Sequence, residues 1–126
     1  MAILDTTFLI DVLRNKESAL ALRRKLTGDA LIVPTPAIME LWAGALNSKL
    51  GAAGKRQVEE LLATMTVANF EIQSAKRAAE LKIALRNEPI DTEDFMIAGI
   101  ALSRGDQVVT RDEHYARIPG LRVLKY

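Results

Sequence analysis

The sequence predicts a single α/β domain: a parallel β-sheet with helices on both faces. Short apolar segments that fit buried strands alternate with longer segments in which apolar residues recur at helical spacing. The chain has 126 residues, close to the size of one domain, and no linker, repeat or low-complexity stretch divides residues 1–126. Its hydrophobic content of 49% is that of an ordinary folded protein.

The first part of the chain predicts two strands, each followed by helices. The expected elements are a strand at residues 2–5, helices at 6–14 and 17–26, a strand at 30–33, a helix from 35 and another that carries Val58, Leu61, Leu62 and Met65. Gly28 is expected to close the second helix, and Pro34 to stop the second strand. Gly51–Gly54 should interrupt the chain between the last two helices.

The helix from residue 35 has the clearest signals. Thr35 is a suitable N-cap, and Pro36 suits the first helical position. The apolar residues that follow lie at i, i+3, i+4, i+7 and i+8, and are Ile38, Leu41, Trp42, Ala45 and Leu46. We therefore expect these side chains to face the core.

The second part predicts three further strands. The expected elements are a short strand within 65–70, a helix at 74–87, a helix from a cap at Asp91 to about Arg104, a strand at 107–110 and a strand at 121–124. Gly105 should end the helix before the fourth strand. Ligands of such sheets bind at the carboxyl ends of the strands, where the strand order reverses.

Acidic residues follow these strand ends. Asp5 ends the first strand, and the alternative role for it is a helix N-cap. Asp112 follows the fourth strand, and its alternative role is an ordinary loop or cap aspartate. Asp11, Asp91, Glu93, Asp106 and Glu113 are interpreted as caps or surface charges.

Two more acids lie on helices. The alternative role for Glu40 is an ordinary solvated glutamate. However, the other residues on its side of the helix are small and uncharged, which indicates that another chain, a substrate or a metal-bearing groove lies against it. Asp94 lies on the same stripe as Ile97 and Ala98 in a nearly all-apolar helix. The helix dipole would explain an acid somewhere in the first turn, but not an acid in line with the buried stripe. A buried carboxylate needs a cation or several hydrogen-bond donors.

Composition narrows the chemistry. The chain has no cysteine and one histidine, which excludes thiolate and multi-histidine metal sites. Carboxylate oxygens select Mg²⁺ or Mn²⁺, and such ions support phosphodiester hydrolysis. The net charge of +1 argues against a uniformly basic nucleic-acid coat. No basic leader or membrane-length apolar run is evident, so we expect a cytoplasmic protein without a membrane span.

The order of these motifs resembles the PIN-domain ribonucleases, and among them the VapC toxins of type II toxin–antitoxin pairs. The similarity covers essentially the whole chain. It rests on LDT at the N-terminus, E-L-x-x-G from Glu40, P-I-x-x-x-D-x-x-I-A from Pro89, and V-T-R-D with I-P-G-L-x-V from Val109.

The resemblance implies a PIN-like α/β/α sandwich with a parallel sheet in the order 3-2-1-4-5. It implies that Asp5 and Asp94 are the main Mg²⁺ ligands and that Glu40 and Asp112 complete the acidic site, directly or through water. Thr6 and Thr110 would position Asp5 or water. The activity would be metal-dependent endoribonuclease cleavage that leaves a 3′-hydroxyl. The partners would be RNA, a small VapB-like antitoxin and a second copy in a homodimer.

Two alternatives from other functional classes remain. One is a PIN fold that has lost catalysis and serves as a binding module. The other is a Mg²⁺-binding phosphoacceptor signalling domain, which should show paired acids after the first strand and a lysine after the fifth. Two threonines follow Asp5 instead, and Lys125 lies close to the end of the sequence.

Overall fold

The computed structural model describes residues 1–26 and 31–126. Five parallel strands form one sheet in the order β3-β2-β1-β4-β5, which confirms the predicted fold class and order. The strands are β1 (Ala2–Leu4), β2 (Leu31–Pro34), β3 (Thr66–Ala68), β4 (Gln107–Thr110) and β5 (Val123–Lys125). Their short, apolar character fits strands that are covered on both faces.

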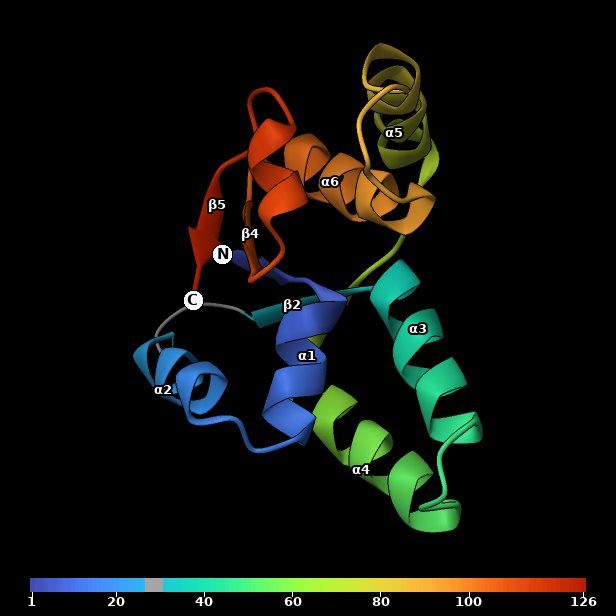
Figure 1. Cartoon of the computed structure of the whole chain (residues 1–126), viewed down its shortest axis with the longest axis vertical. Coiled ribbons are helices and arrows are strands. Elements are labelled where there is room, and N and C mark those ends of the chain that lie inside the picture. Colours follow the sequence, from blue (N-terminus) through green and yellow to red (C-terminus); the bar gives the residue numbers. More distant parts are fainter. Residues whose placement is uncertain (27–30) are drawn as a thin grey trace.

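Helices cover both faces of this sheet. They are α1 (Thr6–Leu13), α2 (Glu17–Lys25), α3 (Thr35–Leu46), α4 (Ala52–Leu62), α5 (Ile72–Ala84), α6 (Thr92–Arg104) and the 3₁₀ helix η1 (Glu113–Arg117). In Figure 1, α1 to α4 lie on one side of the sheet and α5, α6 and η1 on the other. The sides change because the chain crosses from β3 to β4, on the other side of β1, and right-handed crossovers in opposite directions place their helices on opposite faces.

The central strand β1 organises the core. Every residue of β1 is fully buried. In its register with β4, Leu4 pairs with Val109, and the Asp5 backbone N–H donates to the Val109 carbonyl at 3.0 Å. The strand order reverses at this pair of strands, so Asp5 and Thr110 lie side by side at the switch point.

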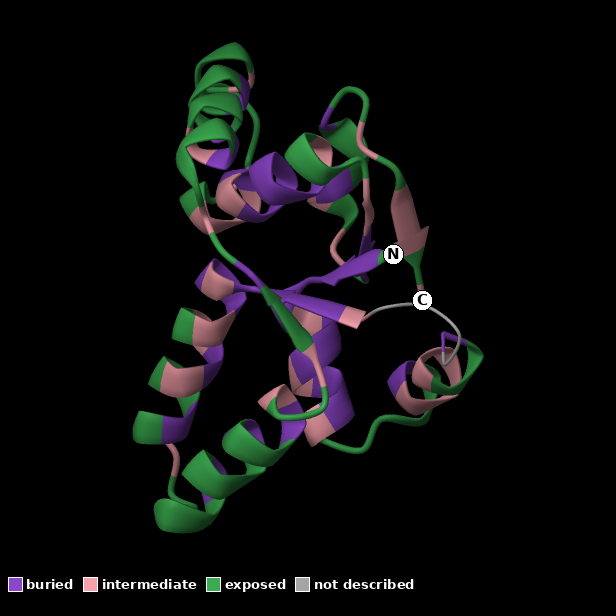
Figure 2. Ribbon diagram, turned by 180° about the vertical axis from the view of Figure 1, so that it is seen from behind, coloured by how far each residue is buried: buried purple, intermediate pink, exposed green. Residues whose placement is uncertain are grey.

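Helix α6 is buried along its middle, as Figure 2 shows by its purple colour beside the largely green α5. The two helices approach closely at Gly99: a Cβ there would lie 2.5 Å from the Ser74 carbonyl oxygen and 3.1 Å from the Ala78 Cβ. Only glycine permits this approach. The packing fixes the course of α6 and therefore of Asp94 in its first turn.

Several local predictions for the first half of the chain need correction. Thr35 is not an N-cap but the first residue of α3, and its hydroxyl accepts from the Phe70 N–H at 3.1 Å. Leu46 is exposed, since the buried stripe of α3 is carried by Pro36, Ala37, Leu41 and Ala45. Helix α4 begins at Ala52, within the predicted interruption. Gly28 and the start of the predicted 30–33 strand lie outside the described residues.

In the second half, the strand at 107–110 and the end of α6 at Gly105, which adopts a φ of 72°, match the prediction. Asp91 occupies the N-cap position of α6 without a side-chain capping bond. Helix α5 lies at 72–84 and β5 at 123–125, each offset by a few residues from its predicted bounds. Across the described ranges, no helix combines the length and apolar character needed to cross a membrane.

Candidate active site

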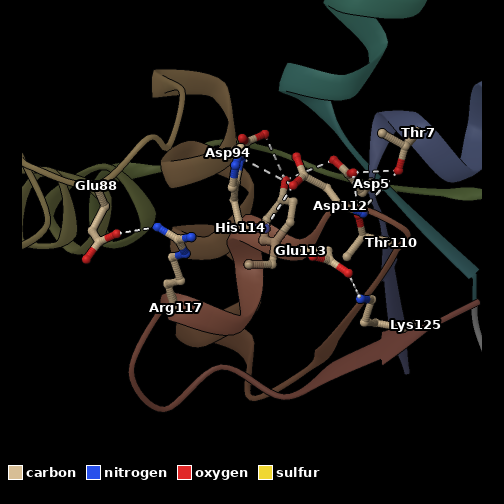
Figure 3. Close-up of polar contacts among 11 residues, drawn as sticks. Asp5, Thr7, Glu88, Asp94, Thr110, Asp112, Glu113, His114, Arg117 and Lys125 are labelled. Atoms are coloured by element: carbon tan, nitrogen blue, oxygen red, sulfur yellow. Dashed lines mark hydrogen bonds and ion pairs between the residues drawn. The ribbon is translucent and has the colours of Figure 1, made fainter.

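Three of the four predicted acids meet at the carboxyl ends of the central strands. Asp5 follows β1, Asp112 lies two residues beyond β4, and Asp94 is in the first turn of α6. Figure 3 shows these three side chains pointing toward one another. The switch point of the sheet is thus the place where the acids gather.

Asp5 is buried, with 3% of its surface exposed, and hydroxyls hold its carboxylate. Its Oδ2 accepts from Thr7 Oγ1 at 2.8 Å and from Thr110 Oγ1 at 2.7 Å. Its Oδ1 accepts from the Tyr115 hydroxyl at 2.9 Å. Asp5 stands at the N-cap position of α1 but makes no capping bond, so the capping role is wrong for its side chain.

Asp94 is half-buried and carries an unfavourable charge. Burial raises the pKa of its carboxyl to about 7, and the charges of Asp5 and Asp112 add to this, while the hydrogen bond with Tyr115 opposes it. The Tyr115 hydroxyl lies 3.2 Å from Asp94 Oδ1. A carboxylate near other carboxylates is stabilised in its charged form by a nearby cation and otherwise takes up a proton, as the raised pKa indicates.

Asp112 joins this group from the other side. Asp112 is the N-cap of η1, which confirms the cap alternative for this residue: its Oδ1 accepts from the backbone N–H of His114 at 2.9 Å. The same oxygen lies 3.3 Å from His114 Nδ1. Asp94, Asp112 and His114 each offer a ligand atom, and these atoms lie within 4.8 Å of one another. The Asp112 backbone N–H also donates to Thr110 Oγ1 at 3.0 Å, which ties this loop to the hydroxyl that bonds Asp5.

Glu40 lies at the margin of the acidic group. Its Oε1 accepts from Thr6 Oγ1 at 2.8 Å, so Thr6 bonds Glu40, and it is Thr7 that bonds Asp5. Burial raises the pKa of Glu40; the bond from Thr6 opposes this, and the charge of Asp5 adds to it. Glu40 also lines a groove between α1, α3 and α4, whose other lining residues include Ile10, Arg14, Leu41, Gly44, Leu50 and Val58.

The donor set fits a hard divalent cation. Asp94, Asp112 and His114 offer two carboxylate oxygens and one nitrogen, and the Asp5 carboxylate lies next to them across the Tyr115 hydroxyl. Carboxylate oxygens are the ligands that Mg²⁺ and Mn²⁺ accept, and Mn²⁺ tolerates the nitrogen. Among the described side chains, no lysine or arginine forms an ion pair with Asp5 or Asp94. Within the described part of the chain, the charges of Asp5 and Asp94 therefore have no lysine or arginine beside them, and Asp112 has only the His114 imidazole at 3.3 Å.

Lys125 does not serve the acidic group either. Its Nζ pairs with Glu113 Oε1 at 3.1 Å, and Figure 3 shows this pair apart from the three aspartates. The lysine that a phosphoacceptor domain would use is therefore missing from this position, which argues against that alternative.

Tyr115 is a residue of this site that the sequence reasoning missed. The available signal was an aromatic residue shortly after the last acidic motif, which ordinarily indicates core packing. Its ring is indeed fully buried, but its hydroxyl reaches both Asp5 and Asp94.

Asp11 was misassigned to the surface. It is 1% exposed, and its Oδ2 accepts from Arg111 Nε at 2.7 Å and from the Tyr126 hydroxyl at 2.7 Å. Lys16 Nζ lies 3.5 Å from its Oδ1. Asp11 lies three residues after the buried Phe8 in α1, so both residues are on the same buried face of the helix. The position of Asp94 on a buried helix face was the reason for singling it out, and the same reason applied to Asp11.

Comparison with known proteins gives consistent results. The PIN domain family model matches residues 2–121. A VapC of Salmonella typhimurium, described as a tRNA(fMet)-specific endonuclease, is 31% identical over 123 residues, which are 95% of this chain and 93% of the relative. A protein of the same description from Shigella flexneri is 28% identical over 122 residues, 94% of this chain and 92% of the relative.

Solved structures agree with this. The DNA-bound VapBC of Salmonella typhimurium matches with a TM-score of 0.85 and 31% identity, over 98% of this chain and 96% of that one. The VapBC2 of Rickettsia felis, bound to a promoter DNA fragment, has a TM-score of 0.91 at 19% identity, over 99% and 98% of the two chains, and supports the fold. The chain belongs to the PIN-domain family, within its VapC branch.

Proposed function

We propose that this VapC-type chain is a divalent-metal-dependent endoribonuclease, the toxin of a toxin–antitoxin pair. The observation that carries the proposal is the acidic group at the strand ends: Asp94 and Asp112 offer ligand atoms within 4.8 Å of one another, and the Tyr115 hydroxyl joins Asp94 to Asp5. The names of the Salmonella and Shigella relatives support RNA as substrate and make tRNA(fMet) the first one to test.

Each residue has a defined part in this proposal. Asp5 and Asp94 would hold Mg²⁺ or Mn²⁺, with Glu40 and Asp112 in contact directly or through water. When bound, the cation supplies Lewis-acid activation of water and balances phosphate charge. Thr7 and Thr110 keep Asp5 in one orientation, because both of their hydroxyls donate to its Oδ2. Water attack on phosphorus would break the P–O3′ bond and leave a 3′-hydroxyl.

The groove beside Glu40 supports the proposed antitoxin partner. It lies between α1, α3 and α4 and is lined by apolar side chains with Glu40 and Arg14 among them. A segment of a small partner protein seated there would reach the acidic site through Glu40. The VapBC complexes among the similar structures support a partner of this kind. The homodimer stays a prediction, and sedimentation of the chain with and without its partner tests it.

The decisive experiment is cleavage of purified RNA with and without Mg²⁺. We expect Asp5→Asn and Asp94→Asn each to lower the cleavage rate about a thousandfold, because losing a metal ligand removes several kcal/mol of transition-state stabilisation. Asp106→Asn is the matched control, since Asp106 pairs with Arg104 and not with the acids. Cleavage by Asp5→Asn and Asp94→Asn at the wild-type rate, or a wild-type rate that does not change with Mg²⁺, would contradict the proposal. Absence of cleavage by the wild type would favour a binding module.

A further inference from the structure

A single buried hydroxyl joins the two carboxylates on which the proposed metal chemistry depends. Tyr115 lies in η1 with 0% of its surface exposed. Its hydroxyl oxygen is 2.9 Å from Asp5 Oδ1 and 3.2 Å from Asp94 Oδ1. The phenol therefore connects the end of β1 to the first turn of α6 through one atom.

This hydroxyl has only one proton for two acceptors. If the hydroxyl donates its proton to Asp5, the lone pairs of its oxygen face Asp94. If it donates to Asp94, the lone pairs face Asp5. Burial and the two carboxylates hold the pKa of Tyr115 well above its usual value, so the phenol stays neutral. It can orient the two carboxylates, but it cannot balance their charge. A cation is still required beside it.

The two carboxylates depend on this phenol to different degrees. Asp5 keeps two further bonds to its Oδ2, from Thr7 and Thr110. For Asp94, in the part of the chain that the structure describes, Tyr115 is the single side-chain donor. Removal of the hydroxyl would therefore leave Asp5 held and free Asp94 to rotate away from it.

We propose that the Tyr115 hydroxyl is a positioning group for the divalent cation, which it serves by holding Asp94 against Asp5 so that both carboxylates bind the ion together. The proposal rests on the proposed metal-dependent function. Groups that hydrogen-bond to metal ligands fix the ligand geometry, and their loss lowers metal affinity ~10–100-fold. We expect a loss of that size when the hydroxyl is removed and the ring is kept.

The test compares the two tyrosines of the chain. Tyr115→Phe removes the hydroxyl at the acidic site. Tyr126→Phe is the matched control, because the Tyr126 hydroxyl donates to Asp11 instead. The dissociation constant for Mn²⁺ is measured by electron paramagnetic resonance of the free ion. We expect it to rise about 10–100-fold in Tyr115→Phe and to stay at the wild-type value in Tyr126→Phe.

A second measurement does not depend on the Tyr115→Phe variant. In Tyr126→Phe, Tyr115 is the only tyrosine left, and its near-ultraviolet absorbance should change when Mg²⁺ is added. Two results would overturn the positioning role. One is that Tyr115→Phe binds Mn²⁺ as tightly as the wild type does. The other is that the absorbance of Tyr115 does not change although Mg²⁺ binds. If the wild type itself binds no Mn²⁺, the metal-dependent function fails instead, so the two failures are distinguishable.

Discussion

Two buried aspartates at the start of the fold have opposite surroundings. Asp5 precedes α1 and Asp11 lies within it, and each accepts a hydrogen bond from a tyrosine hydroxyl, Tyr115 or Tyr126. Asp11 also receives Arg111 at 2.7 Å. Among the described side chains, the carboxylate of Asp5 accepts hydrogen bonds from hydroxyl groups alone, and it lies near the carboxylate of Asp94.

The pKa values separate the two regions. Burial raises the pKa of Asp11, but the bonds from Arg111 and Tyr126 outweigh burial and hold it below its usual value. In the other region the pKa of Asp94 rises to about 7 through burial and the charges of Asp5 and Asp112. The difference teaches that burial alone does not mark a functional acid. A buried acid paired with its own cation serves the structure, whereas a group of acids without one, with a raised pKa, is a candidate functional site.

Added Mg²⁺ should have the largest effect on this contrast. A ligand at 100 times its dissociation constant stabilises the folded state by about 2.7 kcal/mol. We expect this gain, measured by urea unfolding, in the wild type and in Asp11→Asn, and none in Asp5→Asn. Equal stabilisation of Asp5→Asn would show that the ion binds elsewhere.

Neutralising each aspartate without metal should give opposite results. Asp11→Asn should lower the free energy of unfolding by about 2 kcal/mol, less than a fully buried pair would lose, because Arg111 is partly exposed. Asp5→Asn should leave stability unchanged or raise it, because it removes repulsion from Asp94. Unfolding in a chelating buffer measures both. A larger loss for Asp5→Asn than for Asp11→Asn would contradict the comparison.

The pH dependence of stability should show the smallest effect. Because the pKa of Asp94 is raised from 3.8 to about 7 in the folded state, that state binds more protons between these values. Stability from this group is therefore lost as pH rises through that range, by an amount on the order of 1 kcal/mol after allowance for partial exposure. Asp94→Asn should remove this slope between pH 3.8 and about 7 in metal-free unfolding. Asp11, with its lowered pKa, should contribute no slope in this range.

Much of the fold was predictable because it follows from local patterns. Buried strands and amphipathic helices alternate, and strand β4 and the end of α6 at Gly105 appear where the sequence places them. The missed details depend on tertiary contacts. Thr35 bonds the backbone of Phe70, which lies 35 residues away and which no local signal could indicate. Helix η1 is one short turn between β4 and β5, too short for periodicity to reveal.

The acids of the site were predictable because strand ends and a buried stripe mark them. The hydroxyls were harder, since threonine and tyrosine serve in cores as often as in sites. Thr110 bonds Asp5, as expected. The resemblance implied the same contact for Thr6, but Thr7 makes it, and Thr6 bonds Glu40 instead. Tyr115 reaches Asp5 across 110 residues of sequence, so only the folded chain brings them together.

Arg111 and Asp112 are consecutive, yet they serve the two different regions. Arg111 bonds Asp11, while Asp112 lies with Asp94 and His114. The two side chains contact different groups, so their order on the chain decides which region each one enters. Substitutions here change one region at a time. An insertion or deletion of one residue would exchange the two side chains, and put an arginine among the acids and an acid opposite Asp11. We therefore expect the length of the chain from Val109 to Tyr115 to be under tighter constraint than the identity of most residues within it.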